Sequence, residues 1–178
     1  MTYDELRDRL GRDIPKFVDV LNALPTINFF VEPKSDSSVE PLAKIVTENN
    51  AINRVYLCSF FPHRLEKLRD LVGAGANLML MLSRSPTLLL HEWRHLKNEA
   101  WRSGVGLSAV GIPNVLSTKG SVEKVQSWGL KVLVWTPNTK EQIKRAIKLG
   151  ADGIISDNVQ LLKQIILDLN PNSGSFNL

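Results

Sequence analysis

Residues 131–158 read KVLVWTPNTKEQIKRAIKLGADGIISDN, and this stretch decides the fold. It begins with an apolar run, 131–135, and ends with a second one, 153–156. Between them, Thr139–Leu149 places its apolar side chains at helical spacing and leaves its lysines to water. A strand, a helix and a second strand in this order are typical of the βα units that build a parallel sheet.

The same order of strand and helix repeats along the chain. Apolar runs predict strands at Ile27–Glu32, Arg54–Phe60, Asn77–Leu82, Gly106–Val110, Lys131–Trp135 and Gly153–Ser156. The helices predicted after them are Val39–Asn49, His63–Val72, Thr87–Arg102, Ser121–Trp128, Thr139–Leu149 and Asn158–Leu169. In front of the first strand the pattern predicts only helix, at Thr2–Leu10 and Pro15–Leu24.

Six such units fit two α/β architectures, a doubly wound open sheet and an incomplete (β/α)8 barrel of the TIM type. A complete barrel needs about 250 residues, with about 200 as the lower limit, and this chain has 178. We therefore expect one α/β domain over residues 1–169 with N-terminal helices before its βα units. Residues 170–178 have little to bury, and we expect them to form a flexible tail.

The composition is that of a soluble globular domain, with 43% hydrophobic and 22% charged residues. No apolar run approaches the roughly 18 to 20 residues of a membrane span, and no targeting peptide is visible. Cys58 is the only cysteine, which excludes an internal disulfide and favours the cytoplasm. The net charge of +4 is spread over several helices, so we expect no nucleic-acid partner.

Polar side chains follow the ends of most predicted strands. Carboxyl ends of parallel strands form the edge at which α/β proteins bind ligands. A carboxylate, a lysine and several hydroxyls suit a divalent metal, Mg²⁺ or Ca²⁺, together with a phosphate. Taken alone, Glu32 and Lys34 fit a surface ion pair on a loop equally well. The full set is Glu32, Lys34, Ser59, Ser83, Arg84, Trp135, Thr136, Asn138, Ser156 and Asp157.

Four of these segments share their order and spacing with one known family. They are Val31–Lys34 (VEPK), Cys58–Phe60 (CSF), Val134–Asn138 (VWTPN) and Gly150–Asp157 (GADGIISD). In these segments the chain resembles the glycerophosphodiester phosphodiesterase family, from about Tyr3 to about Leu162. Residues 13–21 (DIPKFVDVL) also resemble the family's helix before its Glu-x-Lys strand.

The resemblance implies a (β/α) barrel that cleaves glycerophosphodiesters to glycerol 3-phosphate and an alcohol. The family uses a divalent metal and two histidines as general acid and base. By resemblance, Glu32 is one of the metal-binding carboxylates, Lys34 contacts the phosphate and Trp135 forms the aromatic wall of the substrate pocket. These roles suit the residues, because a lysine offsets developing charge and an indole packs on the glycerol carbons.

The family begins with a His-Arg-Gly strand, an Asn-Thr turn, a Glu-x-Asp pair and a His-Asp strand end, and none of these motifs stands before Glu32. We therefore expect that both catalytic histidines, two metal carboxylates and the first two barrel strands are missing. Pro33, Cys58 and Val159 are smaller departures from the family pattern. The open sheet edges of such a barrel need a cover. A complementing N-terminal chain, a homodimer or the N-terminal helices could each supply it.

Three histidines offer further chemistry. His63 follows the second strand near the expected active face, where it could replace a lost acid-base group or simply begin a helix. His91-Glu92-Trp93-Arg94-His95 spells the His-Glu-x-x-His signature of zinc peptidases. The helix has an apolar stripe made of Leu89, Trp93, Leu96 and Ala100, and this stripe places both histidines toward solvent. Their exposure argues against a zinc site in the protein interior.

The sequence thus predicts a metal-dependent phosphoric diester hydrolase of glycerophospholipid metabolism that lacks its own acid-base histidines. One alternative is a catalytically inactive remnant that binds phosphate esters or a partner chain. A zinc metallopeptidase using His91 and His95 is the other alternative.

Overall fold

The computed structural model describes residues 2–169, so the expected tail at 170–178 lies outside the described residues. Its strands are β1 (Phe29–Val31), β2 (Val55–Ser59), β3 (Asn77–Met81), β4 (Leu107–Pro113), β5 (Lys131–Trp135) and β6 (Gly153–Ile155). Its α-helices are α1 (Tyr3–Leu10), α2 (Phe17–Ala23), α3 (Val39–Glu48), α4 (Pro62–Val72), α5 (Pro86–Lys97), α6 (Glu99–Val105), α7 (Lys119–Gln126), α8 (Lys140–Lys148) and α9 (Val159–Leu169). Two short 3₁₀ helices, η1 (Asp36–Ser38) and η2 (Ile52–Arg54), precede α3 and β2.

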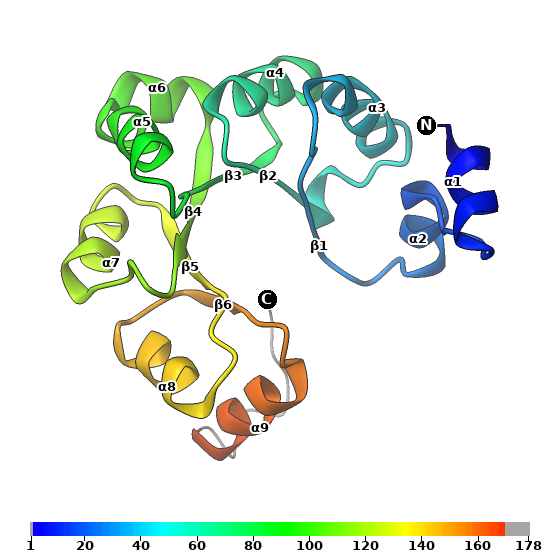
Figure 1. Cartoon of the computed structure of the whole chain (residues 1–178). Helices are drawn as coiled ribbons and strands as arrows, with labels where there is room; N and C mark the ends of the chain where they lie inside the picture. The colour runs from blue at the N-terminus through cyan, green and yellow to red at the C-terminus, as the bar shows by residue number, and fades with distance from the viewer. Residues whose placement is uncertain (1, 170–178) are drawn as a thin grey trace.

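The strands form one parallel sheet in the order β1-β2-β3-β4-β5-β6, so each strand pairs with the next in sequence. The sheet curls, and α3 to α9 lie along its convex side (Figure 1). A doubly wound sheet would change direction along the strand order and carry helices on both faces. The incomplete TIM-type barrel is therefore confirmed, and the doubly wound alternative is wrong.

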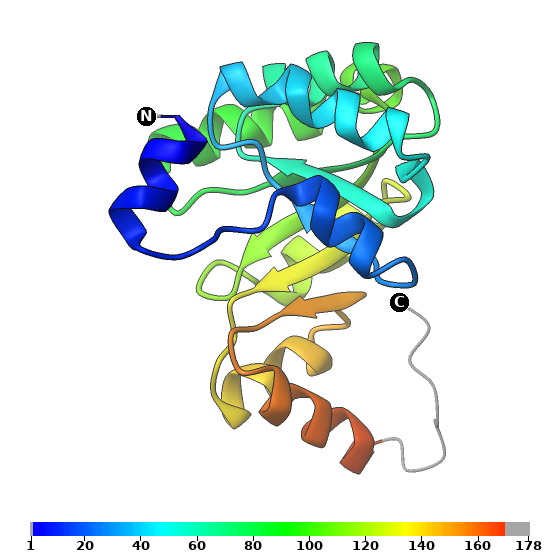
Figure 2. The ribbon, with the colours of Figure 1, turned by 90° about the vertical axis from the view of Figure 1, so that its right-hand side faces the viewer.

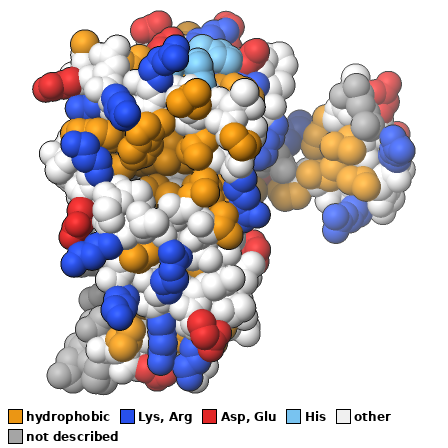
Figure 3. All heavy atoms as spheres, turned by 60° about the vertical axis from the view of Figure 1, so that its left-hand side comes forward, with side chains coloured by type: hydrophobic (Ala, Val, Ile, Leu, Met, Phe, Trp, Pro, Cys, Tyr) orange, Lys and Arg blue, Asp and Glu red, His pale blue; other side chains and the backbone are white. Residues whose placement is uncertain are grey.

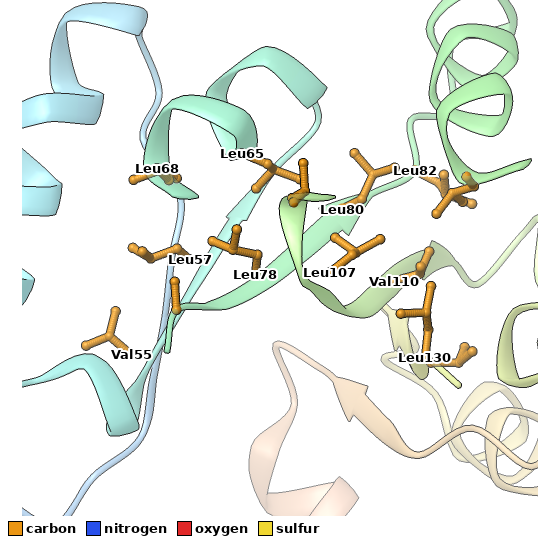
Figure 4. Close-up of a cluster of buried hydrophobic side chains, with 14 of the residues drawn as sticks. Val55, Leu57, Leu65, Leu68, Leu78, Leu80, Leu82, Leu107, Val110 and Leu130 are labelled. Carbon is orange, nitrogen blue, oxygen red and sulfur yellow. The ribbon is translucent and has the colours of Figure 1, made fainter. Parts of the chain in front are cut away.

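The main hydrophobic core lies between the sheet and the outer helices. Successive strand residues point to opposite faces, and Leu57, Leu78 and Leu80 point outward. They meet Leu65 and Leu68 of α4, and all five side chains are fully buried (Figure 4). Burying such a side chain stabilises the fold by about 1.5–3 kcal/mol, so this layer holds the sheet in its curl.

The N-terminal helices pack beside β1. Phe17 of α2 meets Phe29 of β1 edge to face at 6.0 Å between ring centroids, and Arg54 donates hydrogen bonds to the carbonyl oxygens of Leu21 and Leu24. Helices α1 and α2 lie on the β1 side of the barrel opening and α9 lies on the β6 side (Figure 2). In the described part of the chain, β1 and β6 remain the two edges of the sheet.

The helix predicted at Thr87–Arg102 is two helices, and that prediction is wrong in its length. Asn98 ends α5 and caps α6, because its side-chain oxygen accepts the backbone N–H of Trp101 at 3.2 Å. An N-cap asparagine requires extended backbone, which breaks the helix at this point. The change of direction also exposes Ala100, which therefore leaves the predicted apolar stripe.

Candidate functional site

The concave face of the sheet carries a second, smaller apolar cluster. Its buried members alternate with the outward-facing leucines along the strands, and half-buried side chains of β5, of β6 and of the segment just after β2 pack against them. One end of this face is the carboxyl edge of the parallel strands, where barrel enzymes place their sites. The cluster consists of Cys58, Met79, Met81 and Ala109, with Phe60, Leu133, Trp135 and Ile155 packed against them.

Glu32 and Lys34 lie directly after β1 at this edge. The Lys34 Nζ is 2.5 Å from Glu32 Oε2. The lysine side chain is 79% exposed, whereas the glutamate side chain is only 20% exposed. Arg64 Nη1 donates to the carbonyl oxygen of the buried Pro33 at 3.0 Å, which fixes the backbone between the two charged residues. Arg64 thus fixes the backbone of the ion pair, and the lysine of the pair remains open to solvent.

Cys58 of β2 is near this pair. Burial, and secondly the Glu32 carboxylate, raise the pKa of the Cys58 thiol to about 12. A thiol with such a pKa is protonated at neutral pH and is a poor nucleophile and metal ligand. Cys58 therefore serves as an apolar wall of the concave face.

Trp135 lies at the end of β5. Its ring meets Phe60 edge to face at 5.8 Å, although Phe60 directly follows β2 and Trp135 ends β5. The Arg84 guanidinium lies over the same ring, 5.4 Å from its centroid. The Trp135 Nε1 atom is buried without a hydrogen-bond partner in the described chain. Trp135 thus offers an apolar ring and a donor, with a cation beside them.

Gly111 of β4 makes this position of Trp135 possible. A Cβ atom at Gly111 would lie 2.5 Å from Met81 Sδ and 3.3 Å from Trp135 Cδ1. Both distances are too short for ordinary carbon contacts, so the tryptophan and the methionine use the space that a side chain would occupy. Gly111 is a packing residue of the site that sequence analysis missed, because a glycine between Val110 and Pro113 suggests the end of a strand.

His63 begins α4 but has other partners. Its Nε2 lies 3.0 Å from Asp36 Oδ1, which also accepts a 2.6 Å hydrogen bond from Arg64 Nε. Hydrogen bonds from Arg64 and then His63 lower the pKa of Asp36. The structure therefore joins His63 to η1 and shows no contact between His63 and Glu32, Lys34 or Trp135 among the described residues.

The His-Glu-x-x-His segment lies on α5, and its glutamate faces inward. Glu92 is fully buried, and its Oε2 accepts the backbone N–H of Ser83 at 2.6 Å. His95 Nδ1 lies 3.0 Å from the His91 carbonyl oxygen, and the two rings lie 4.5 Å apart. His91 is exposed and His95 is half-buried. The glutamate and the histidines thus lie on different sides of the helix, unlike in a zinc peptidase.

Glu92 instead anchors the loop that carries Arg84. Burial raises its pKa from 4.5 to about 7, and the hydrogen bond from Ser83 opposes part of this rise. Its other oxygen, Oε1, has no partner in the described chain. Through Ser83, this carboxyl fixes the connection between β3 and α5, in which Arg84 precedes Ser85 and Pro86.

Asn138 and Asp157 connect the ends of β5 and β6. Asn138 Nδ2 donates to Asp157 Oδ2 at 2.8 Å, and Asn138 Oδ1 accepts from Ser156 Oγ at 3.1 Å and from the Asp157 backbone N–H at 2.9 Å. The sequence places all three side chains at the ligand edge. The structure uses them to hold two loops together.

The residues present do not form a divalent metal site by themselves. Within residues 2–169 no cluster of three or more His, Cys, Asp or Glu side chains could hold a metal ion. Glu32 is already paired with Lys34, and Asp36 with Arg64 and His63. Mg²⁺ and Ca²⁺ prefer about six or more oxygen ligands, so Glu32 could provide only one of several.

Comparison with known proteins identifies the family. The sequence model of the glycerophosphoryl diester phosphodiesterase family matches residues 14–161. The chain belongs to this family. The family match covers the segments that contain Glu32, Lys34 and Trp135, and it ends just before Leu162.

Individual relatives agree with this assignment. The chain is 26% identical to "Probable glycerophosphodiester phosphodiesterase 2" of Mycobacterium tuberculosis, over 88% of this chain and 61% of the relative. A crystal structure from Silicibacter pomeroyi, of a protein assigned as a glycerophosphoryl diester phosphodiesterase, matches 95% of this chain and 68% of its own, with a TM-score of 0.78 and 20% identity.

An Oleispira antarctica phosphodiesterase, solved with the product sn-glycerol 3-phosphate, matches 86% of this chain and 61% of its own. Its TM-score is 0.66 at 16% identity, a likeness of fold. The chain thus spans about three fifths of the length of this phosphodiesterase and of the curated relative from Mycobacterium tuberculosis. No helix within residues 2–169 is long and apolar enough to cross a membrane.

Proposed function

We propose that this chain provides the phosphate-binding and glycerol-binding part of a site that hydrolyses glycerophosphodiesters. The observation that carries the proposal is the meeting of a cation, Arg84, and an apolar wall, Trp135 and Phe60, at the carboxyl edge of a family barrel. A phosphate diester of glycerol needs both features, since it joins an anion to a short carbon chain.

Two cations serve the phosphate in this proposal. The Lys34 ammonium can turn from Glu32 toward an anion, because its side chain is 79% exposed and free to change rotamer. Arg84 has no ion-pair partner within residues 2–169, and its guanidinium can bind two phosphate oxygens at once. Trp135 would pack on the glycerol carbons and exclude water, and its unpaired Nε1 would donate to a substrate oxygen.

The acid-base groups of the reaction come from elsewhere in this proposal. A divalent cation would polarise the phosphoryl oxygens when bound, with Glu32 as one oxygen ligand beside carboxylates from outside residues 2–169. The relatives' additional length can supply such groups, either in a complementing chain or in another segment of the same protein. General acid-base catalysis is worth about 10²–10⁴-fold, so residues 2–169 alone should turn over slowly or not at all.

The inactive phosphate-ester binder is the second candidate. The contact between His63 and Asp36 favours this candidate, because the side chain of the histidine nearest the site already interacts with a carboxylate. Both candidates bind sn-glycerol 3-phosphate, and only the first predicts hydrolysis once the missing groups are supplied.

The test is hydrolysis of glycerophosphocholine by the purified chain, with Mg²⁺, with Ca²⁺ and with neither. The assay is repeated after addition of the N-terminal segment of the Mycobacterium tuberculosis relative. We expect metal-dependent turnover only with that segment, and its loss in Glu32→Ala. A stable complex of the two chains without any turnover would favour the inactive binder.

Turnover that Glu32→Ala leaves unchanged would contradict the assignment of Glu32. Glu40→Ala is the matched control, because Glu40 is an exposed carboxylate of α3 with only a long 3.8 Å contact to Lys67.

A further inference from the structure

The outer surface between α5 and α7 contains an apolar groove of about 440 Å³. Leu89, Leu90 and Trp93 of α5 line the groove, together with Leu116 from the segment between β4 and α7. Leu90 is 65% exposed, and Val115, next to Leu116, is 67% exposed. Figure 3 shows hydrophobic side chains gathered in the upper half of one face of the molecule. Large apolar patches of this kind mark interaction sites rather than ordinary surface.

Aromatic and basic side chains extend the groove. Trp93 packs against Trp128 at 5.9 Å between ring centroids. Arg102 and Lys124 lie over the Trp128 ring, at 4.6 and 5.3 Å from its centroid. An indole that has an apolar body beside a groove and cations on its face is suited to a boundary between hydrocarbon and charged groups.

The charge around the groove is positive. Residues 82–128 contain six Lys and Arg against three Glu, so this segment carries most of the whole chain's net charge of +4. Of the three glutamates, Glu92 is fully buried and Glu123 lies 3.7 Å from Lys119. Figure 3 shows Lys and Arg side chains at the border of the apolar patch. The ligand of this surface should therefore be apolar and anionic together.

The groove lies at the same end of the barrel as the candidate site. Leu82 follows β3 and Ile112 lies near the end of β4, and both contribute to its floor. Arg84, which lies over the Trp135 ring, belongs to the connection between Leu82 and α5. Whatever covers the groove is therefore adjacent to the mouth of the barrel.

We propose that the α5–α7 groove docks this domain onto a membrane surface that contains anionic phospholipids. Leu90, Val115 and Leu116 enter the boundary between headgroups and acyl chains, and the surrounding cations contact the headgroup phosphates. Peripheral binding of this kind uses buried apolar area and basic charge together, and each cation near an anionic surface contributes about a fivefold gain in binding. The inference does not rest on the proposed hydrolysis.

The experiment is cosedimentation of the full chain with vesicles of phosphatidylcholine alone or mixed equally with phosphatidylglycerol. We expect binding to the mixed vesicles that weakens as salt is raised, and little binding to phosphatidylcholine alone. The double variant Leu90→Ser/Val115→Ser should lose at least about tenfold in binding, and so should Arg94→Glu/Lys124→Glu. Exposed residues carry all four substitutions, so the fold should survive, which circular dichroism checks.

Matched control variants change the same residue types elsewhere. Leu71→Ser/Leu167→Ser alters exposed leucines of α4 and α9, and Lys44→Glu/Lys148→Glu alters exposed lysines of α3 and α8. These variants should bind the mixed vesicles more tightly than the groove variants do. Equal losses in groove and control variants would overturn the proposal. So would equal binding to both kinds of vesicle, or a dimer in gel filtration that Leu90→Ser/Val115→Ser dissociates, since the groove would then join two copies.

Discussion

The two faces of the curled sheet are built differently. The convex face is covered by helices, and its leucines are buried. Among residues 2–169, the apolar cluster of the concave face has four buried members, and Trp135 and Ile155 beside them are half-buried. The convex face therefore accounts for most of the stability of the fold. The concave face depends on small packing details and on whatever lies across the barrel opening.

Truncation of a buried side chain should reveal the difference between the two faces most strongly. Leu65→Ala on the convex side should destabilise the protein by about 2–5 kcal/mol, because it leaves a cavity among fully buried neighbours. Ile155→Ala on the concave side should cost less than half as much, since Ile155 is half-buried and solvent can fill the space. Urea unfolding measures both. Equal losses would mean that the concave face is as tightly packed as the convex one.

Stability should depend on pH through Glu92, which lies under the loop of the concave site. Its folded-state pKa is raised from 4.5 to about 7, so the folded protein holds this proton more tightly than the unfolded chain does. The contribution of Glu92 to the free energy of unfolding should therefore be largest below pH 4.5 and should fall as the pH rises to about 7. The total fall is at most about 3 kcal/mol, at 1.36 kcal/mol for each pKa unit.

Glu92→Gln removes this titration and keeps an oxygen for the Ser83 N–H. The variant should show a flatter stability profile between pH 4.5 and 7 than the parent chain. Urea unfolding at several pH values measures it, with Glu99→Gln on the exposed surface as the control. A profile for Glu92→Gln as steep as that of the parent would show that another group titrates.

A methyl group at Gly111 tests the packing of the concave face itself. Gly111→Ala should destabilise by about 1–3 kcal/mol, because its Cβ would meet Met81 and Trp135. It should also shift Trp135 fluorescence, which Gly104→Ala should not do, since a Cβ at Gly104 meets no atom within 4 Å. An unchanged fluorescence spectrum would mean that Trp135 does not rest against β4.

The reactivity of Cys58 tests the burial of the concave cluster without a substitution. With its pKa at about 12, the folded thiol should react with iodoacetamide at pH 8 at least about 100-fold more slowly than the same thiol in urea. Glu32→Gln should speed the reaction of the folded chain modestly, because the glutamate is the secondary cause of the shift and burial is the primary one. A fast reaction in the folded state would place Cys58 outside the buried cluster.

The same difference between the faces explains what the sequence could predict. The six strands of the sheet follow from apolar runs between helices with capped ends, and each observed strand overlaps its predicted range. These features are local. The periodicity did not fix their order in the sheet, because it fitted a doubly wound sheet as well as a barrel. The break at Asn98 was also visible locally, as an Asn-Glu pair that can begin a helix, but the continuous apolar spacing hid it.

The sequence predicted the positions of single site residues but not the contacts between them. Glu32, Lys34 and Trp135 lie at strand ends, as expected, and their roles remain predictions. Contacts between distant segments could not be predicted, because periodicity does not show which loop meets which. The links from Asp36 to His63 and from Glu92 to Ser83 are of this kind. They show that His63 and Glu92 are held by structural partners.

The most direct test of the central claim is calorimetric binding of sn-glycerol 3-phosphate to the chain and to Lys34→Ala, Arg84→Ala and Trp135→Phe. We predict saturable binding to the parent chain, weakened at least about tenfold in Lys34→Ala and Arg84→Ala, as expected for lost hydrogen bonds to a charged group. The exposed Lys44→Ala should bind like the parent. Equal binding by all variants, or none by the folded parent, would contradict a phosphate-binding and glycerol-binding site on this face.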